Sequence, residues 1–193
     1  MSWLIIIFII IAISTFILML THKDLLRDEV QEEAFNKFVS DHNIINPKKP
    51  FSLARVQIAM WTIIIIFTYL DVYFCKGCCN TISLSLNKTA LILLGISIGT
   101  TAIAGTIDNS QQNNQRHQNE PSNGILLDIL SDGNGISIHR FQVILFTIVA
   151  MIIYINKVSC NCATLPELDD TLLGIITISY SGYVGMKINE NKT

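Results

Sequence analysis

The chain has 193 residues, of which 50% are hydrophobic and only 15% are charged, and its mean hydropathy is +0.47. A soluble domain of this length needs a more charged surface, so the composition argues against one and predicts a membrane protein. The net charge of −2 gives the chain as a whole no attraction for nucleic acid.

The first apolar run covers residues 3–20 and contains no charged residue. No lysine or arginine precedes it, and no small-residue cleavage site follows it, so we expect a retained anchor rather than a cleaved signal peptide. Residues 1–21 are therefore predicted to form an N-terminal transmembrane anchor.

Residues 22–50 are predicted to be a cytoplasmic amphipathic linker, because leucine, valine and phenylalanine alternate with charges at helical intervals. Such a helix could lie on the membrane surface or against a partner. It could equally continue the first span into water. The sequence INPKKP then ends the helical pattern.

Four further apolar runs follow, at residues 56–74, 89–107, 141–155 and 168–186. They predict two transmembrane hairpins, over residues 51–107 and 137–188. The polar loop between the hairpins covers residues 108–136. Its first part is rich in Asn and Gln and is expected to be flexible. Ile125, Leu126, Ile129 and Leu130 then suit a short amphipathic helix that ends at DGNG.

The basic residues predict the orientation, since cytoplasmic loops carry an excess of Lys and Arg. In a five-span arrangement ten of the 13 basic residues fall on one side. The N-terminus is therefore expected outside and the C-terminus in the cytoplasm of a bacterial inner membrane. The cysteines gather in two turns on the outer side, which favours disulfides, with reduced thiols or a metal as alternatives. They are Cys75, Cys78, Cys79, Cys160 and Cys162.

The two hairpins share a sequence pattern. Ser52, Arg55, Gln57 and Thr62 match Ser137, Arg140, Gln142 and Thr147 at a constant spacing, and TALILLGISIGT matches TLLGIITISYSG. Each half contains an even number of spans, so both hairpins point the same way. The predicted fold is an all-α membrane protein with five spans: an N-terminal anchor helix and two tandem parallel-repeat hairpins.

Residues 51–188 resemble a widespread bacterial inner-membrane protein family of unsettled function. The resemblance rests on PFSLARVQIAMWT, LLGISIGTTAIAGTID, LLDILSDGNGISIHRFQVILFT and LPELDDTLLGIITISYSGYVGMKI. It implies the duplicated two-helix architecture and an inner-membrane location, but no reaction. The last span departs from the family, because TISYSG stands where the family has a second G-I-S-x-G-T.

The repeated helix starts supply the first group of candidate site residues. Ser52 and Ser137 suit helix caps. The basic residues could bind lipid phosphate, pair with acidic residues such as Asp128 and Asp132, or hold a soluble anionic ligand. The amides are expected to bond between helices. The group comprises Arg55, Gln57, His139, Arg140 and Gln142.

Small and hydroxyl-bearing residues in the third and fifth spans form the second group. They suit close helix packing or, alternatively, a pore wall. The group comprises Gly95, Ser97, Gly99, Thr100, Ser179, Ser181 and Gly185.

We expect no enzyme, no cofactor and no metal site, since there is no catalytic motif, and the one acidic pair in an apolar run stands at the front edge of the last span and not in its interior. The leading hypothesis is a homo-oligomeric channel or membrane-perturbing effector that a cytoplasmic protein, nucleotide or oligonucleotide gates, in a setting such as antiphage defence. A scaffold that docks a partner through its linker and polar loop is the alternative. A small-solute transporter that uses Asp71 or Gln142 is the third.

Overall fold

In the computed structural model the chain is mostly helical. The structure describes residues 10–11, 14–19, 21, 24–76, 86–110, 120–132, 135–160 and 165–188. The long helices of this part of the chain are α3 (Leu53–Lys76), α4 (Lys88–Ser110), α6 (Ile138–Cys160) and α7 (Asp170–Lys187). The short elements are α2 (Glu32–Asp41), α5 (Ile125–Leu130), β1 (Ser131–Asp132) and β2 (Gly135–Ile136).

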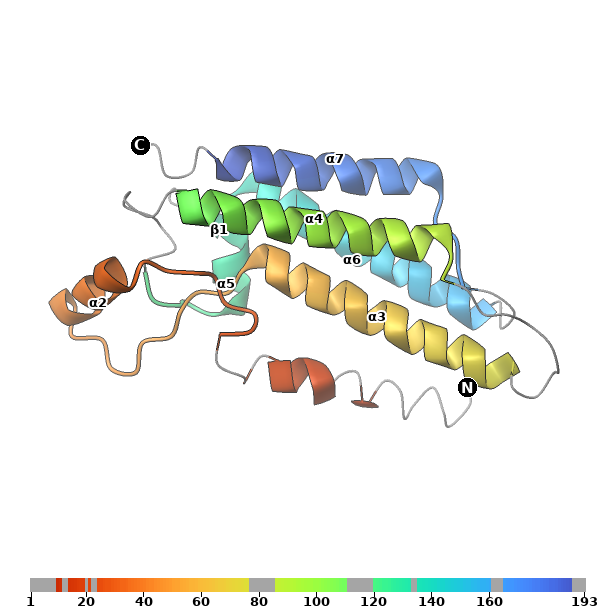
Figure 1. The fold of residues 1–193 in the computed structure, drawn as a ribbon, viewed down its shortest axis with the longest axis horizontal. Helices are drawn as coiled ribbons and strands as arrows, with labels where there is room; N and C mark the ends of the chain where they lie inside the picture. The colour runs from red at the N-terminus through yellow and green to blue at the C-terminus, as the bar shows by residue number, and fades with distance from the viewer. Residues whose placement is uncertain are drawn as a thin grey trace.

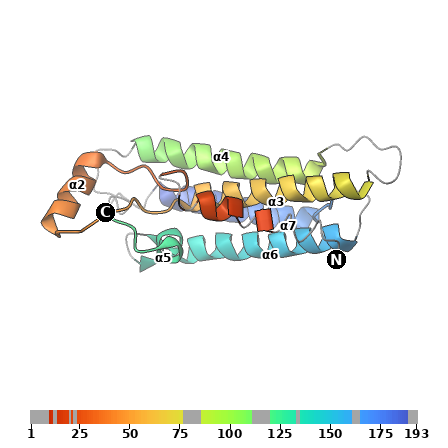
Figure 2. The same cartoon turned by 90° about the horizontal axis from the view of Figure 1, so that it is seen from below.

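The long helices form one elongated bundle (Figures 1 and 2). Within each hairpin, α3 packs on α4 and α6 packs on α7, and the hairpins join through α4 with α7 and α3 with α6. The helices α3 and α6 begin at one end of the bundle, and α4 and α7 finish at that same end. We call it the linker end, because α2, α5 and the residues that lead from α2 to α3 lie there.

Among the described residues, three helices are long and apolar enough to cross a membrane: Leu53–Tyr73, Lys88–Ser110 and Ile138–Val158. They coincide with the second, third and fourth predicted spans, and they identify the chain as a membrane protein. The fifth predicted span forms the helix α7, whose Thr, Ser, Tyr and Gly residues make it the most polar of the four long helices. The first predicted span lies mostly outside the described residues.

The repeated helix starts form as the sequence pattern predicts. Ser52 and Ser137 each stand directly before the first residue of α3 and α6, and both are buried. The carbonyl of Ser52 accepts the N–H of Val56 at 3.0 Å, and the carbonyl of Ser137 accepts the N–H of Phe141 at 3.0 Å. Both serines therefore occupy the N-cap position of their helix.

A carboxylate caps the start of α7. The side chain of Asp169 accepts the backbone N–H of Thr171 at 3.0 Å, which satisfies a donor that has no partner within the helix. A carboxylate at the start of a helix also complements the helix dipole.

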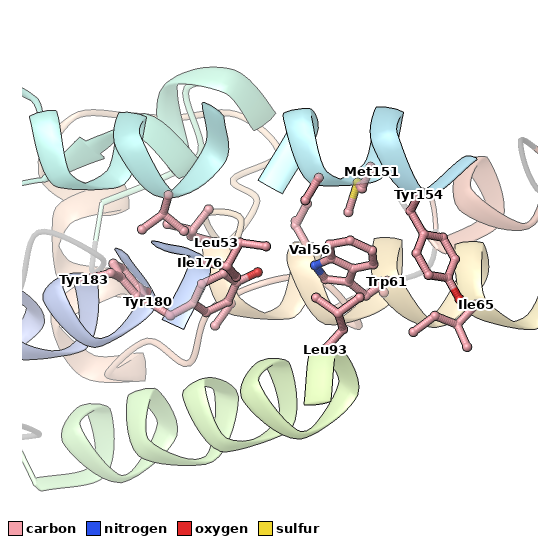
Figure 3. Packing of buried hydrophobic residues seen from close by; sticks show 14 of the residues in the cluster. Leu53, Val56, Trp61, Ile65, Leu93, Met151, Tyr154, Ile176, Tyr180 and Tyr183 are labelled. Atoms are coloured by element: carbon pink, nitrogen blue, oxygen red, sulfur yellow. The ribbon is translucent and has the colours of Figure 1, made fainter. Parts of the chain in front are cut away.

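Aromatic and aliphatic side chains fill the interior of the bundle (Figure 3). Trp61, Tyr154 and Tyr183 are among the largest side chains that are fully buried. The Trp61 and Tyr154 rings meet edge to face at 6.2 Å, an arrangement that stabilises a core by about 0.5–1.5 kcal/mol beyond the area buried. Packed side chains therefore fill the space between the four long helices.

The linker is less helical than its sequence pattern predicts. The helix α2 covers only Glu32–Asp41, and Phe35 is its buried residue. The short helix expected in the polar loop forms at Ile125–Leu130, with Ile129 buried. Ile129 is therefore buried as the amphipathic pattern predicts, whereas Leu126, which was assigned to the same side of the helix, is exposed.

Candidate functional site

At the linker end, the beginning of the linker folds back against the start of α3. The N–H of Asp28 donates to the carbonyl of Pro50 at 2.8 Å, and the N–H of Ser52 donates to the carbonyl of Leu26 at 2.9 Å. Between these bonds, Arg27 and Phe51 face each other as an antiparallel bridge. The linker and the start of α3 are thus joined by a single β-bridge and its flanking hydrogen bonds.

The side chain of Arg27 strengthens this junction. Its guanidinium donates a hydrogen bond to the carbonyl of Lys49 and lies 4.3 Å from the centre of the Phe51 ring. Guanidinium groups stack favourably on aromatic faces. Arg27 is buried, so its guanidinium contacts protein groups and is shielded from solvent.

A buried ion cluster lies next to this junction and joins three segments. Lys187, the last residue of α7, is fully buried. Its Nζ lies 2.9 Å from Oδ2 of Asp108 in α4 and 3.7 Å from Oδ2 of Asp28 in the linker. Both carboxylates are almost completely shielded from solvent. Buried charges persist only when they are paired, so each member depends on the others.

Sequence reasoning missed this cluster. It placed Asp28 in the amphipathic linker, Asp108 in the polar loop and Lys187 at the end of the second hairpin, and it did not predict that they meet. A signal was present, because Asp108 and Lys187 carry opposite charges and end two apolar runs on the same side of the bundle. Two opposite charges at one depth in neighbouring helices can pair.

The two arginines of the repeated motif have different surroundings. Arg55 Nη2 lies 2.7 Å from Oε1 of Glu29, at the protein surface. Arg140 is buried, with its guanidinium carbon 5.5 Å from the centre of the Tyr183 ring. Arg140 is thereby shielded from solvent and from lipid phosphate groups, one of the three kinds of partner suggested for it, whereas Arg55 keeps part of its side chain exposed.

The cavity beside Arg140 is small. It encloses about 20 Å³ and is also lined by Asp28, Phe51, Glu120 and Asp128, among others. A water molecule needs roughly 10–15 Å³, so this cavity has room for a water. Arg55 does not line it.

Asp128 holds the polar loop in place. Its Oδ2 accepts the N–H of Phe51 at 3.0 Å and the hydroxyl of Ser122 at 2.6 Å, while Oδ1 accepts the N–H of Asn123 at 2.9 Å. The sequence suggested Asp128 as a partner for the motif arginines. In the structure it instead binds backbone and hydroxyl groups, and it attaches α5 to the start of α3.

The glutamines of the motif also differ. Gln57 is buried, and its Nε2 donates to Oγ1 of Thr147 at 3.1 Å, which joins α3 to α6. Oγ1 of Thr147 lies in turn 3.4 Å from the hydroxyl of Tyr180 in α7. Gln57 thus forms the expected bond between helices. Gln142 is exposed, and His139 beside the motif is half-buried.

Burial in the two halves is displaced by one residue relative to the sequence match. On α6 the residues Val143, Thr147 and Met151 are buried. The match pairs them with Ile58, Thr62 and Ile66, none of which is buried. The buried residues of α3 are one position earlier, at Gln57, Trp61 and Ile65. One residue corresponds to about 100° around a helix, so these matched residues face different surroundings, although Ile65 and its match Ala150 are both buried.

The hydroxyls of the second candidate group face in two directions. Ser97, Thr100 and Ser179 are buried within the bundle. Ser181 is exposed, and its hydroxyl donates to the carbonyl of Thr177 at 2.8 Å. The three buried members therefore pack inside one chain, while Ser181 is available to the surroundings.

The glycines of this group make no close contact within the described part of the chain. A Cβ atom added at Gly95, Gly99 or Gly185 would meet nothing within 4 Å. Glycines that permit close helix approach normally lie against a neighbour. The expected close packing is thus absent among the described helices, and these surfaces are open.

The predicted disulfides lie outside what the structure describes. Cys78, Cys79 and Cys162 belong to undescribed segments, and the side chains of Cys75 and Cys160 are likewise outside the described set. Within the described ranges, no three His, Cys, Asp or Glu side chains gather as a metal site requires.

The fold and its surface define the class of the protein. Apolar residues point outward from the spans, including Ile66 on α3, Ile98 on α4 and Ile152 on α6, which is the pattern of a helical bundle in lipid. The chain is thus an integral membrane protein with a packed interior. No family model matches the sequence, and no curated protein or solved structure matches it.

Proposed function

We propose that the protein is a homo-oligomeric channel of the bacterial inner membrane, in which copies surround a shared pore and α7 faces that pore. The observation that carries the proposal is the outward face of α7, where Thr177, Ser181, Gly182 and Gly185 are exposed beside the apolar Ile178 and Met186. Hydroxyls and glycines gain little from contact with lipid chains, but they suit helix contacts or a wetted wall.

The outward face of α6 provides the comparison. Leu145, Ile148 and Ile152 are exposed there, as expected of a surface that contacts lipid. If a pore forms between copies, α7 is the long helix that fits its wall and α6 is the one that fits the lipid boundary. The interior of a single chain does not suit a pore, because Trp61 and Tyr154 fill it.

The proposal includes the finer features of the architecture. With the N-terminal segment and α7 as additional spans, the membrane contains five spans, the N-terminus is outside, and the linker end is cytoplasmic. The hairpins then form a parallel repeat. A linker joined through Asp28 to Lys187 at the end of α7 is placed to transmit a cytoplasmic signal to the pore helix. An effector in antiphage defence would use such a gate.

The direct test is thiol accessibility of the purified protein in lipid vesicles. In a background without the native cysteines, Ser181→Cys should react quickly with a charged, water-soluble thiol reagent and lose ion flux. The matched variant Ile152→Cys also replaces an exposed span residue, but it should react slowly and keep its flux. Equal reactivity at both positions, or no flux with or without nucleotides and oligonucleotides, would contradict a pore along α7.

A docking scaffold is the second candidate, and the position of α2 favours it. This helix stands apart from the bundle beyond the linker end (Figure 1). Its residues Glu32, Glu33 and Lys37 are exposed, as a partner-binding surface would require. A scaffold predicts that deletion of residues 32–41 abolishes capture of a cytoplasmic partner. It also predicts no ion flux from either the native chain or the deletion variant, since a scaffold has no pore.

A further inference from the structure

An exposed apolar surface lies at the linker end, outside the packed core. It consists of Leu126, Leu127, Ile136 and Ile138, which we call the rim patch. Their exposed fractions are 68%, 49%, 70% and 70%. Four large apolar residues so exposed within one short segment indicate an interaction surface.

The helix α5, which carries Leu126 and Leu127, is firmly attached to the bundle. On its other side, α5 buries Ile129 in the core and binds the backbone of Phe51 through Asp128. The following strands β1 and β2 pair in an antiparallel manner. A fixed scaffold therefore turns Leu126 and Leu127 outward.

The rim patch continues the outward face of α6. Ile138 belongs both to the patch and to the span Ile138–Val158. The next exposed apolar residues along that helix are Phe141, Leu145 and Ile148, and α5 lies beside the start of α6 in both views (Figures 1 and 2). An apolar surface that contacts lipid thus extends beyond the end of its helix.

The length of the span sets the depth of the patch. The 21 residues of Ile138–Val158 extend about 31 Å at 1.5 Å per residue, close to the roughly 30 Å of a bilayer's hydrocarbon core. The residues directly before Ile138 therefore reach the boundary between acyl chains and head groups. Short amphipathic helices occupy this level with their apolar side immersed.

We propose that the rim patch is a membrane-contact surface, and that α5 and the β1–β2 hairpin lie in the head-group layer with Leu126, Leu127 and Ile136 in the lipid. The described residues 125–132 and 135–136 are then an interfacial element rather than part of an aqueous connection. Because Asp128 binds the backbone of Phe51, this contact also sets the depth at which the linker joins α3. The proposal requires a membrane protein, but it does not require a pore.

The test uses the photoreactive amino acid benzoylphenylalanine in the full chain, reconstituted in vesicles of phosphatidylcholine and phosphatidylglycerol. One variant carries it in place of Leu126 and a second in place of Ile136. The control carries it in place of Ile45, which is 88% exposed in the linker. After irradiation, mass spectrometry measures the yield of lipid adducts.

We expect lipid adducts at positions 126 and 136 in several-fold higher yield than at position 45. Equal yields at all three positions would overturn the proposal, and so would crosslinks at 126 and 136 to a second copy in place of lipid. If one labelled variant does not fold, as judged by gel filtration, the other decides the result. Loss of ion flux does not affect this measurement, so the rim patch and the pore are tested separately.

Discussion

Lys187 and Asp108 form a buried ion pair, with 2.9 Å between Nζ and Oδ2, although 79 residues separate them in the sequence. The pair joins the ends of α7 and α4, and Asp28 brings the linker to the same ammonium group at 3.7 Å. The long helix with the most polar outward face is therefore attached at its last residue to the segment that precedes the core spans. If the linker moves relative to α7, the contact between Asp28 and Lys187 must change.

Removal of the lysine should destabilise the protein strongly. Lys187→Met leaves two buried carboxylates without their cation, and breaking a buried pair in this way costs roughly 3–5 kcal/mol. The free energy of unfolding, measured by denaturant titration in detergent, should fall by that amount. The double variant Lys187→Met with Asp108→Leu should recover part of the loss, since it removes a stranded charge as well. A single variant as stable as the native chain would show that the pair is not buried.

Removal of the linker's carboxylate should act more locally. Asp28→Asn keeps the Lys187–Asp108 contact and weakens only the attachment of the linker. Amide hydrogen exchange at residues 28 and 52, which bond to Pro50 and Leu26, should accelerate in this variant. The amides in the middle of α4 should not change.

The neighbouring residue provides a matched control. Glu29→Gln removes the surface pair with Arg55, in which the Glu29 side chain is 56% exposed. Exposed pairs contribute only about 0–1 kcal/mol, so exchange at the linker junction should stay close to that of the native chain. Equal acceleration in the two variants would contradict a specific role for Asp28.

The local features of this fold could be predicted from the sequence. Ser52 and Ser137 mark the starts of α3 and α6, because caps depend on adjacent backbone groups. The helix at Ile125–Leu130 follows from spacing within six residues. The three membrane-spanning helices follow from long apolar runs. Each of these features depends on neighbours along the chain.

The surroundings of the motif residues could not be predicted in the same way. In apolar spans nearly every position is hydrophobic, so the sequence does not show which face turns inward. Matched residues therefore looked equivalent, although Gln57 is buried and Gln142 is exposed. The same limit applies to Lys187, whose partners are selected by how α4, α7 and the linker meet. Packing between distant segments decides these features.

The bond between Gln57 and Thr147 should couple α3 to α6 measurably. Interhelical hydrogen bonds in membrane proteins average about 0.6 kcal/mol and reach about 1–2 kcal/mol. A double-mutant cycle with Gln57→Leu and Thr147→Val should give a coupling energy in that range. The analogous cycle with Gln142→Leu and Thr147→Val should give none, because Gln142 points outward. Equal coupling energies would mean that the motif glutamines are interchangeable.

The open glycines lead to the most direct prediction about assembly. Gly185→Leu and Gly95→Leu place side chains where nothing lies within 4 Å, so each chain should unfold with nearly native stability. If copies meet along α7 and α4, the same variants should shift the protein toward smaller assemblies, as light scattering of the detergent-solubilised protein would show, and should reduce flux.

Ala104→Leu provides the comparison, because Ala104 is buried in the core on α4. Overpacking of a core typically costs about 1–3 kcal/mol, so this variant should lose stability within each chain. The two kinds of substitution should therefore separate assembly from folding. An unchanged assembly in both glycine variants would place the contact between copies elsewhere, and the outward hydroxyls of α7 would then face lipid.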